Sequence, residues 1–170
     1  MIYDYKKLYE KNATFFRERV GLTKVLRIFN KLSTALFFVA YGVFLVYAIK
    51  TDYTSENLIK ILGAPALCLF LVTVLRLAVD RPRPYDEAGA GITPLHNKKG
   101  DGKSFPSRHL ACAFVIATTL LPYALWASIP LFVIGLCLAY ARFALGLHYP
   151  SDLFFGILLG VGCGLLPLLF

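Results

Sequence analysis

Long apolar runs constrain the fold of this chain more than any other feature. Five of them approach the 20 or so residues that a helix needs to cross a bilayer. We expect membrane spans at about residues 32–49, 58–79, 110–126, 131–145 and 153–170. Hydrophobic residues make up 58% of the chain and charged residues 16%, against about 45–50% and 25% in soluble domains. The sequence therefore predicts an all-α, polytopic membrane bundle of about five transmembrane helices.

Residues 1–31 precede the first span and differ from it in composition. Aromatic and aliphatic side chains there alternate with Lys and Arg. This mixture is too polar to span a membrane and favours one or two amphipathic helices lying in the interface, aromatic side down. We expect a segment of residues 1–31 followed by a membrane domain of residues 32–170. A cytosolic helical extension is the alternative for the first segment.

The charge balance, 18 Lys and Arg against 10 Asp and Glu, suits an anionic partner. Such a partner can be nucleic acid, anionic lipid or an anionic substrate. The basic residues flank the spans and form no soluble module, which argues against nucleic acid. The four cysteines lie inside apolar runs without zinc-site spacing, so we expect them to be small core residues.

Residues 142–152, between the last two apolar runs, contain Arg142, His148 and Asp152. Ionisable residues near membrane depth are functional candidates. Pro150 favours the start of a helix, which puts His148 just before that helix and Asp152 in its first turn. A carboxylate there can accept a hydrogen bond from one imidazole nitrogen and leave the other free as nucleophile or base. The simpler alternative is an interfacial histidine and a helix-start aspartate.

A long polar segment, residues 80–105, leads into the third span. Ser107 is a suitable N-cap, and the N–H groups of a helix start bind anions. His109 would lie in the first turn, beside that anion site. Arg76 lies at the end of the second span. The simplest interpretation of this residue is a side chain that extends to the membrane surface.

The last apolar run carries Gly156, Gly160 and Gly164 at intervals of four residues. This spacing is typical of closely packed membrane helices. We therefore expect a packing face there, not a ligand site.

Five spans place the N-terminal segment, the long polar loop and the 146–150 turn at one membrane face. Three span ends then bring basic groups and two histidines together. The residues that gather there are Arg76, Arg83, Ser107, Arg108, His109, Arg142, His148 and Asp152.

These residues form three ordered motifs: Arg76, six residues and Arg83-Pro84; Pro106-Ser107-Arg108-His109; and Arg142, five residues, His148, three residues and Asp152. Together they resemble the signature of the type 2 phosphatidic acid phosphatase family, which includes membrane lipid phosphatases and diphosphatases. The resemblance covers about residues 57–170.

The resemblance implies that His148 is a nucleophile that forms a phosphohistidine and that Asp152 orients it. His109 would protonate the leaving oxygen and then activate water. The phosphoryl oxygens would be held by Arg76, Arg83, Ser107, Arg108 and Arg142. The family phosphatases need neither a metal nor another cofactor.

Three positions depart from the family pattern. Arg76 stands where Lys is usual, so a planar fork replaces a point charge. Ala141 replaces a Ser. Arg108 replaces a Gly and adds a cation beside His109, where it could bind a second substrate phosphate or pair with Asp101 or a lipid headgroup.

The resulting prediction is an integral-membrane lipid phosphate or diphosphate phosphatase. Our first choice of substrate is undecaprenyl or another polyprenyl diphosphate, followed by phosphatidylglycerol phosphate or phosphatidic acid. A non-catalytic lipid-phosphate binder or transporter is the alternative. The presence of His148, Asp152 and His109 together favours the enzyme.

Two signals disagree about which side of the cell membrane the motifs face. All of the Lys and Arg residues except Lys50 and Lys60 fall on the motif face, and the positive-inside rule places such a face in the cytoplasm. Resemblance to bacterial members implies an extracytoplasmic site. We favour the extracytoplasmic face, because a phosphate site needs cations on either side.

Overall fold

The structure is a computed structural model that describes residues 2–51, 53–86, 88–96 and 102–169. All regular secondary structure in these residues is helical, which confirms the all-α prediction. The elements are α1 (Ile2–Arg17), α2 (Val20–Lys50), α3 (Ser55–Val79), α4 (Arg108–Thr119), α5 (Leu125–Ala144), α6 (Pro150–Leu165) and a short 3₁₀ helix, η1 (Leu166–Leu168).

Four of the described helices are long and apolar enough to cross a membrane. They are α2, α3, α5 and the continuous stretch Pro150–Leu168. The predicted polytopic bundle is thus confirmed, but α4, with 12 residues, is shorter than the span expected at 110–126. It ends at Thr119 because residues 120–124 form a turn.

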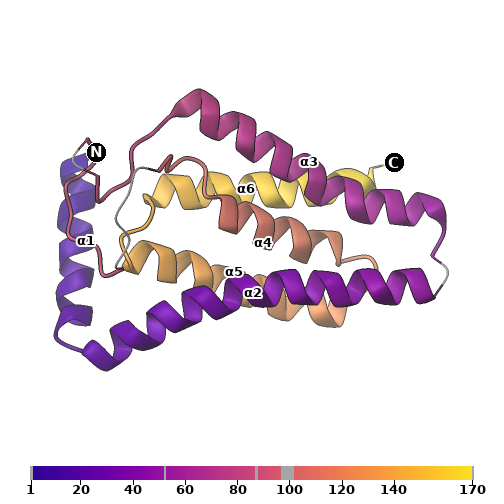
Figure 1. The fold of residues 1–170 in the computed structure, drawn as a ribbon, viewed down its shortest axis with the longest axis horizontal. Helices are drawn as coiled ribbons and strands as arrows, with labels where there is room; N and C mark the ends of the chain where they lie inside the picture. Colours follow the sequence, from indigo (N-terminus) through magenta and orange to yellow (C-terminus); the bar gives the residue numbers. More distant parts are fainter. Residues whose placement is uncertain (1, 52, 87, 97–101, 170) are drawn as a thin grey trace.

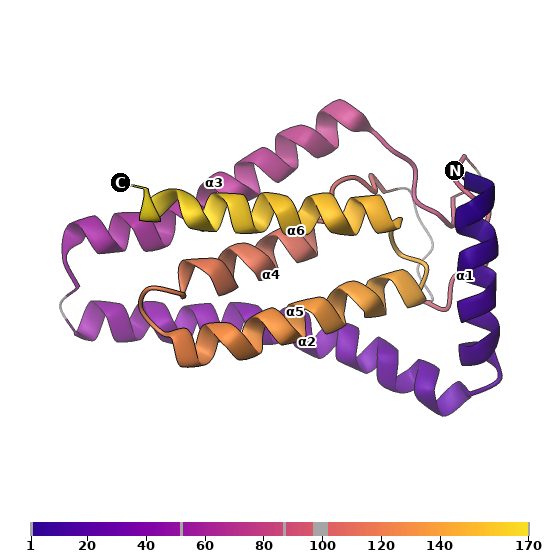
Figure 2. The same cartoon turned by 180° about the vertical axis from the view of Figure 1, so that it is seen from behind.

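Helix α4 is the centre of the bundle (Figures 1 and 2). It contacts α2, α3, α5 and α6. Its residues from Leu110 to Thr119 are almost all buried, as expected of a helix that is hydrophobic all round. The other helices expose many of their large apolar side chains, which suits contact with lipid.

The glycines of α6 allow it to approach α4 closely, which confirms the packing predicted from their spacing. A Cβ atom on Gly160 would lie 2.5 Å from the carbonyl oxygen of Ala111. Cβ atoms on Gly156 and Gly164 would similarly meet Ser107 and Thr118. This contact fixes the start of α6 beside the start of α4.

Helix α2 begins at Val20, upstream of the span expected at 32–49. It runs without a break through the boundary expected at residue 31. Its 31 residues span roughly 46 Å, which exceeds the roughly 30 Å hydrocarbon core. The basic first turns of α2 therefore reach the end of the bundle where the motifs lie.

Helix α1 crosses that same end of the bundle (Figure 1). Tyr5, Tyr9 and Phe16 are buried against Ile92 of the long loop and Leu147 of the α5–α6 turn. We expected this aromatic face to contact lipid. It packs on the protein instead, because the loop and the turn offer it an apolar surface. An interfacial position for α1 stays a prediction.

Candidate active site

The turn between α5 and α6 carries the third motif. Gly146 has φ +74°, and a Cβ there would lie within 3.0 Å of Ile92 and Tyr9, so a side chain at this position would be strained. Pro150 is the first residue of α6, which puts His148 just before the helix and Asp152 in its first turn, as predicted.

His148 is almost completely buried and its Nδ1 is fixed by the backbone. Nδ1 lies 3.0 Å from the carbonyl oxygen of Ser104 and 3.7 Å from Oδ2 of Asp152. A carbonyl oxygen can only accept a hydrogen bond, so Nδ1 carries the proton and donates it to Ser104. Nε2 then keeps its lone pair. The hydrogen bond that orients His148 is therefore the one that Nδ1–H donates to the Ser104 carbonyl oxygen, and Asp152 is a more distant neighbour.

The carboxylate of Asp152 is buried and held by three donors. Oδ1 accepts from Nη1 of Arg81 at 2.7 Å. Oδ2 accepts from the backbone N–H of Tyr149 at 3.0 Å and from the Ser104 hydroxyl. Arg81 also places its guanidinium 4.0 Å from the centre of the Tyr149 ring. The carboxylate therefore joins the long loop to the start of α6.

Burial lowers the pKa of His148 from its usual value to about 4. The nearby positive charges of Arg142 and Arg83 lower the pKa further, whereas Asp152 raises it. At neutral pH the imidazole is therefore uncharged, which is the form that a nucleophile requires.

Three of the predicted phosphate ligands present buried polar atoms without a partner in the described part of the chain. These atoms are Nε of Arg83, Oγ of Ser107 and Nε of Arg142. Leaving a buried donor unsatisfied costs about 1–3 kcal/mol. A bound phosphate, the ligand that the resemblance assigns to these side chains, would offer oxygen acceptors for such donors.

Arg76 has a different arrangement. Its Nη1 donates to the carbonyl oxygen of Pro106 at 3.0 Å, and its Nη2 donates to the carbonyl oxygen of Lys103. The guanidinium thus holds the backbone of the second motif next to the end of α3. Within the described part of the chain, the hydrogen bonds of Arg76 therefore go to the protein backbone.

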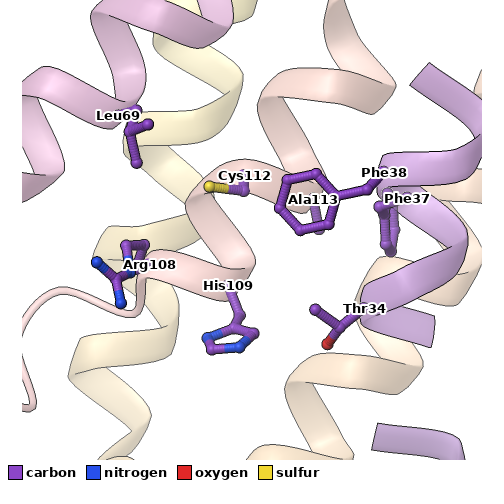
Figure 3. A pocket seen from close by; sticks show the side chains of 8 residues that line it. All are labelled: Thr34, Phe37, Phe38, Leu69, Arg108, His109, Cys112 and Ala113. Atoms are coloured by element: carbon purple, nitrogen blue, oxygen red, sulfur yellow. The ribbon is translucent and has the colours of Figure 1, made fainter. Parts of the chain in front are cut away.

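Two cavities meet at His109. The larger, of about 450 Å³, is called the basic cavity here; its lining comprises Arg27, Ile28, Asn30, Lys31, Thr34, His96, His109, Arg142 and Leu147. The smaller, of about 330 Å³, is mainly apolar and includes Arg108 (Figure 3). His109 and Thr34 line both cavities.

Figure 3 shows the Arg108 and His109 side chains leaving α4 in different directions. Arg108 is exposed and lies on the wall of the apolar cavity. The charges of Arg83, Arg142 and Asp152 act on His148, and the backbone N–H of Ser107 donates to the Asp152 carbonyl oxygen at 2.9 Å. Arg108 instead acts on Arg76 and Cys112.

Residues 57–170 match the model of the PAP2 superfamily. The chain belongs to the PAP2 superfamily. Two curated relatives share part of its sequence. The Escherichia coli K12 protein YbjG, which bears the provisional name of an undecaprenyl-diphosphatase, is 35% identical over 110 residues, covering 64% of this chain and 54% of YbjG. A lipid A 4'-phosphatase of Bacteroides thetaiotaomicron is 37% identical over 91 residues, covering 51% and 40%. The matches thus span about half the length of these PAP2 relatives.

Two solved PAP2-like structures share the fold. Aquifex aeolicus LpxE has a TM-score of 0.68 and 28% identity, covering 88% of this chain and 86% of its own. A PAP2-type phosphatidylglycerolphosphate phosphatase of Bacillus subtilis has a TM-score of 0.71 and 24% identity, covering 98% and 84%. The second likeness concerns the fold alone.

Sequence reasoning missed two residues of this PAP2 site, Arg81 and Ser104. Arg81 stands two positions before Arg83 in an Arg-Pro-Arg-Pro run, and that repeated arginine was an available signal. Ser104 had no such signal, because its carbonyl oxygen contacts His148 through tertiary structure.

Proposed function

We propose that this protein is an integral-membrane lipid phosphate or diphosphate phosphatase that works through a phosphohistidine at His148. One observation carries the proposal. A buried, neutral imidazole, with Nδ1–H bonded to Ser104, stands among unpartnered donors of Arg83, Ser107 and Arg142. This set provides a nucleophile and an oxyanion site in one place.

In the first step, Nε2 of His148 attacks phosphorus. The new N–P bond forms as the bond from phosphorus to the leaving oxygen breaks, and His109 gives its proton to that oxygen. In the second step, water attacks the phosphohistidine, His109 takes a proton from the water, and the N–P bond breaks. Orthophosphate leaves, and both histidines return to their starting states.

Cationic donors would stabilise the charge on the equatorial oxygens in both steps. Arg83, Ser107 and Arg142 are our proposed direct ligands. We propose that Arg76 contributes charge and holds the second motif, and that Arg108 stands at the edge of the site. With these groups in place, we propose a reaction that uses no metal or other cofactor.

The apolar cavity beside His109 suits a lipid chain. Phe37, Phe38 and Leu69 line it, and the relatives named above supply the substrate classes to consider. We place undecaprenyl or another polyprenyl diphosphate first, because YbjG bears the name of such an enzyme. The names of the other relatives support lipid A or phosphatidylglycerol phosphate; phosphatidic acid follows from the motif pattern.

We propose that the site faces the extracytoplasmic side of the cell membrane. Basic side chains are needed to bind phosphate on either side, so those that line the site carry little information about orientation. Residues 1–31 would then lie at that surface, with the phosphatase domain after them.

Phosphate release from a panel of lipid phosphates in neutral detergent would test the proposed function. We expect release with the unmodified protein and none with His148→Ala. Rapid quenching into alkali should trap a labelled phosphohistidine from a ³²P-labelled substrate. Tight binding of a lipid phosphate with no release from any lipid would instead indicate a non-catalytic binder or transporter.

A further inference from the structure

One wall of the basic cavity comes from outside the region that matches the family. That match begins at residue 57, whereas α2 contributes Arg27, Asn30 and Lys31 to the cavity. Residues three and four apart lie on one face of a helix. The first turns of α2 therefore present these polar groups together to the cavity that also contains His109 and Arg142.

The Arg27 side chain is held in place by the long loop. Its Nε donates to the carbonyl oxygen of Leu95 at 2.6 Å. This bond fixes the guanidinium and leaves its two terminal nitrogens to extend beyond the contact. Lys31, one turn later and exposed, adds a second charge with greater freedom.

Asn30 adds a built polar group between the two cations. It is only 8% exposed, and its Oδ1 has no hydrogen-bond partner in the described part of the chain. The oxygen and nitrogen of an amide can exchange places by rotation, so this side chain can turn its NH₂ group to an anion. A buried amide without a partner indicates that the cavity wall is shaped for a polar ligand.

The position of Arg27, Asn30 and Lys31 relative to His109 indicates which part of a bound substrate they would contact. His109 is the proposed acid for the leaving oxygen, and it lines the basic cavity together with Arg27 and Arg142. When His148 attacks the terminal phosphate of a lipid diphosphate, the leaving oxygen belongs to the second phosphate, which is the one attached to the lipid. That phosphate would therefore lie next to His109, on the side where α2 supplies cations.

We propose, on the basis of the proposed function, that Arg27, Asn30 and Lys31 form a subsite for the leaving phosphate of a lipid diphosphate. The subsite makes a diphosphate the preferred substrate over the matching monophosphate. Arg108, the candidate suggested by the sequence, lies on the apolar cavity and is not the main ligand of the second phosphate.

The test compares farnesyl diphosphate with farnesyl monophosphate in neutral detergent. The substitutions are Arg27→Gln with Lys31→Gln, and the matched control is Lys24→Gln, which removes an exposed charge from the same helix. We expect the double substitution to lower kcat/KM for the diphosphate roughly ten- to hundredfold. For the monophosphate, kcat/KM should stay within about threefold, and the control should change neither value by more than that.

Equal losses on the two lipids, or no loss on either, would overturn the subsite. A loss that appears only in vesicles containing anionic lipid would also overturn it, because it would assign the cations to the bilayer surface. If the double variant does not fold, Lys31→Gln alone, at an exposed position, supplies the same comparison.

Binding separates this proposal from the proposed function. In a His148→Ala background, pyrophosphate should bind more tightly than orthophosphate, and the double substitution should remove most of that difference. If no lipid phosphate of the panel is hydrolysed but this result is found, the phosphatase assignment fails and the subsite stands. Equal affinity for the two anions before substitution overturns the subsite.

Discussion

Nη1 of Arg81 lies 2.7 Å from Oδ1 of Asp152, and the carboxylate that it contacts is completely buried. The same nitrogen donates to the Ser151 hydroxyl at 2.8 Å. Arg81 thus fixes the first turn of α6 to the long loop. Since Asp152 and the loop residue Ser104 both lie beside Nδ1 of His148, Arg81 is positioned to act through them on His148, the proposed nucleophile.

Arg81→Ala should lower kcat at least tenfold with little change in KM, because the nucleophile loses its fixed position while the phosphate ligands remain. It should also destabilise the fold by about 1–3 kcal/mol, since it leaves a buried carboxylate with one donor fewer. Arg81→Lys should recover part of kcat. Steady-state kinetics and thermal unfolding in detergent give both values, with the exposed Arg19→Ala as control. A change confined to KM would contradict a positioning role.

The low pKa of His148 predicts activity that persists into mild acid. Protonation inactivates the nucleophile, so an ordinary histidine would cause kcat/KM to fall below about pH 6.5. With a pKa of about 4 in the folded protein, that fall should occur nearer pH 4. A pH profile of kcat/KM, corrected for ionisation of the substrate phosphate, checks this.

Stability should follow the same shift. Between pH 6.5 and 4 the unfolded chain takes up a proton at His148 that the folded protein does not, so the free energy of unfolding falls as the pH falls. His148→Gln should reduce the slope of Tm against pH in this window. An unchanged slope would show that His148 titrates normally in the folded protein.

The glycines of α6 give a matched pair for packing. Gly160→Ala places a methyl group 2.5 Å from the Ala111 carbonyl oxygen, and overpacking of this kind typically costs about 1–3 kcal/mol. A Cβ at Gly162 meets nothing within 4 Å, so Gly162→Ala should be neutral or stabilise the helix by up to about 1 kcal/mol. The unfolding midpoints of the two variants test this difference in stability. Equal effects would show that α6 does not pack on α4 through this face.

Sidedness can be read from two exposed positions at opposite ends of the bundle. In a variant lacking Cys68, Cys112, Cys137 and Cys163, we expect Lys24→Cys to react with an impermeant maleimide on intact cells and Thr51→Cys to react only after permeabilisation. The reverse pattern would place the site in the cytoplasm, as the positive-inside rule predicts.

Chelation tests the metal-free reaction. Activity should survive prolonged treatment with EDTA, because arginine and hydroxyl donors would carry the electrostatic stabilisation. Loss on chelation that Mg²⁺ or Mn²⁺ restores would disprove this part of the proposal.

Local rules located much of the site from sequence. Pro150 gave the start of α6 and hence the places of His148 and Asp152, and the count of spans placed the three motifs at one end. Hydropathy overestimated the length of α4, because apolar residues continue past Thr119 into the turn at 120–124. The amphipathic pattern of α1 likewise gave a buried face but not its partner.

The contacts that complete the site were beyond local rules. Arg81 and Asp152 are 71 positions apart, and Ser104 and His148 are 44 apart. Such pairs depend on the path of the long loop, which neither periodicity nor capping preferences describe. Arg27 and Lys31 fall in the segment predicted to lie in the interface, and the cavity that they line likewise depends on tertiary structure.

The junction of the two cavities at His109 has a consequence for product release. Phe38 and Leu69 line the apolar cavity and are also largely exposed on the outer surface of the bundle, where lipid would surround them. Under the proposed function, the dephosphorylated lipid would diffuse back into the bilayer while orthophosphate left through the basic cavity to water. Reversal would require both products to return at once from different phases, so hydrolysis would be driven forward by their separation.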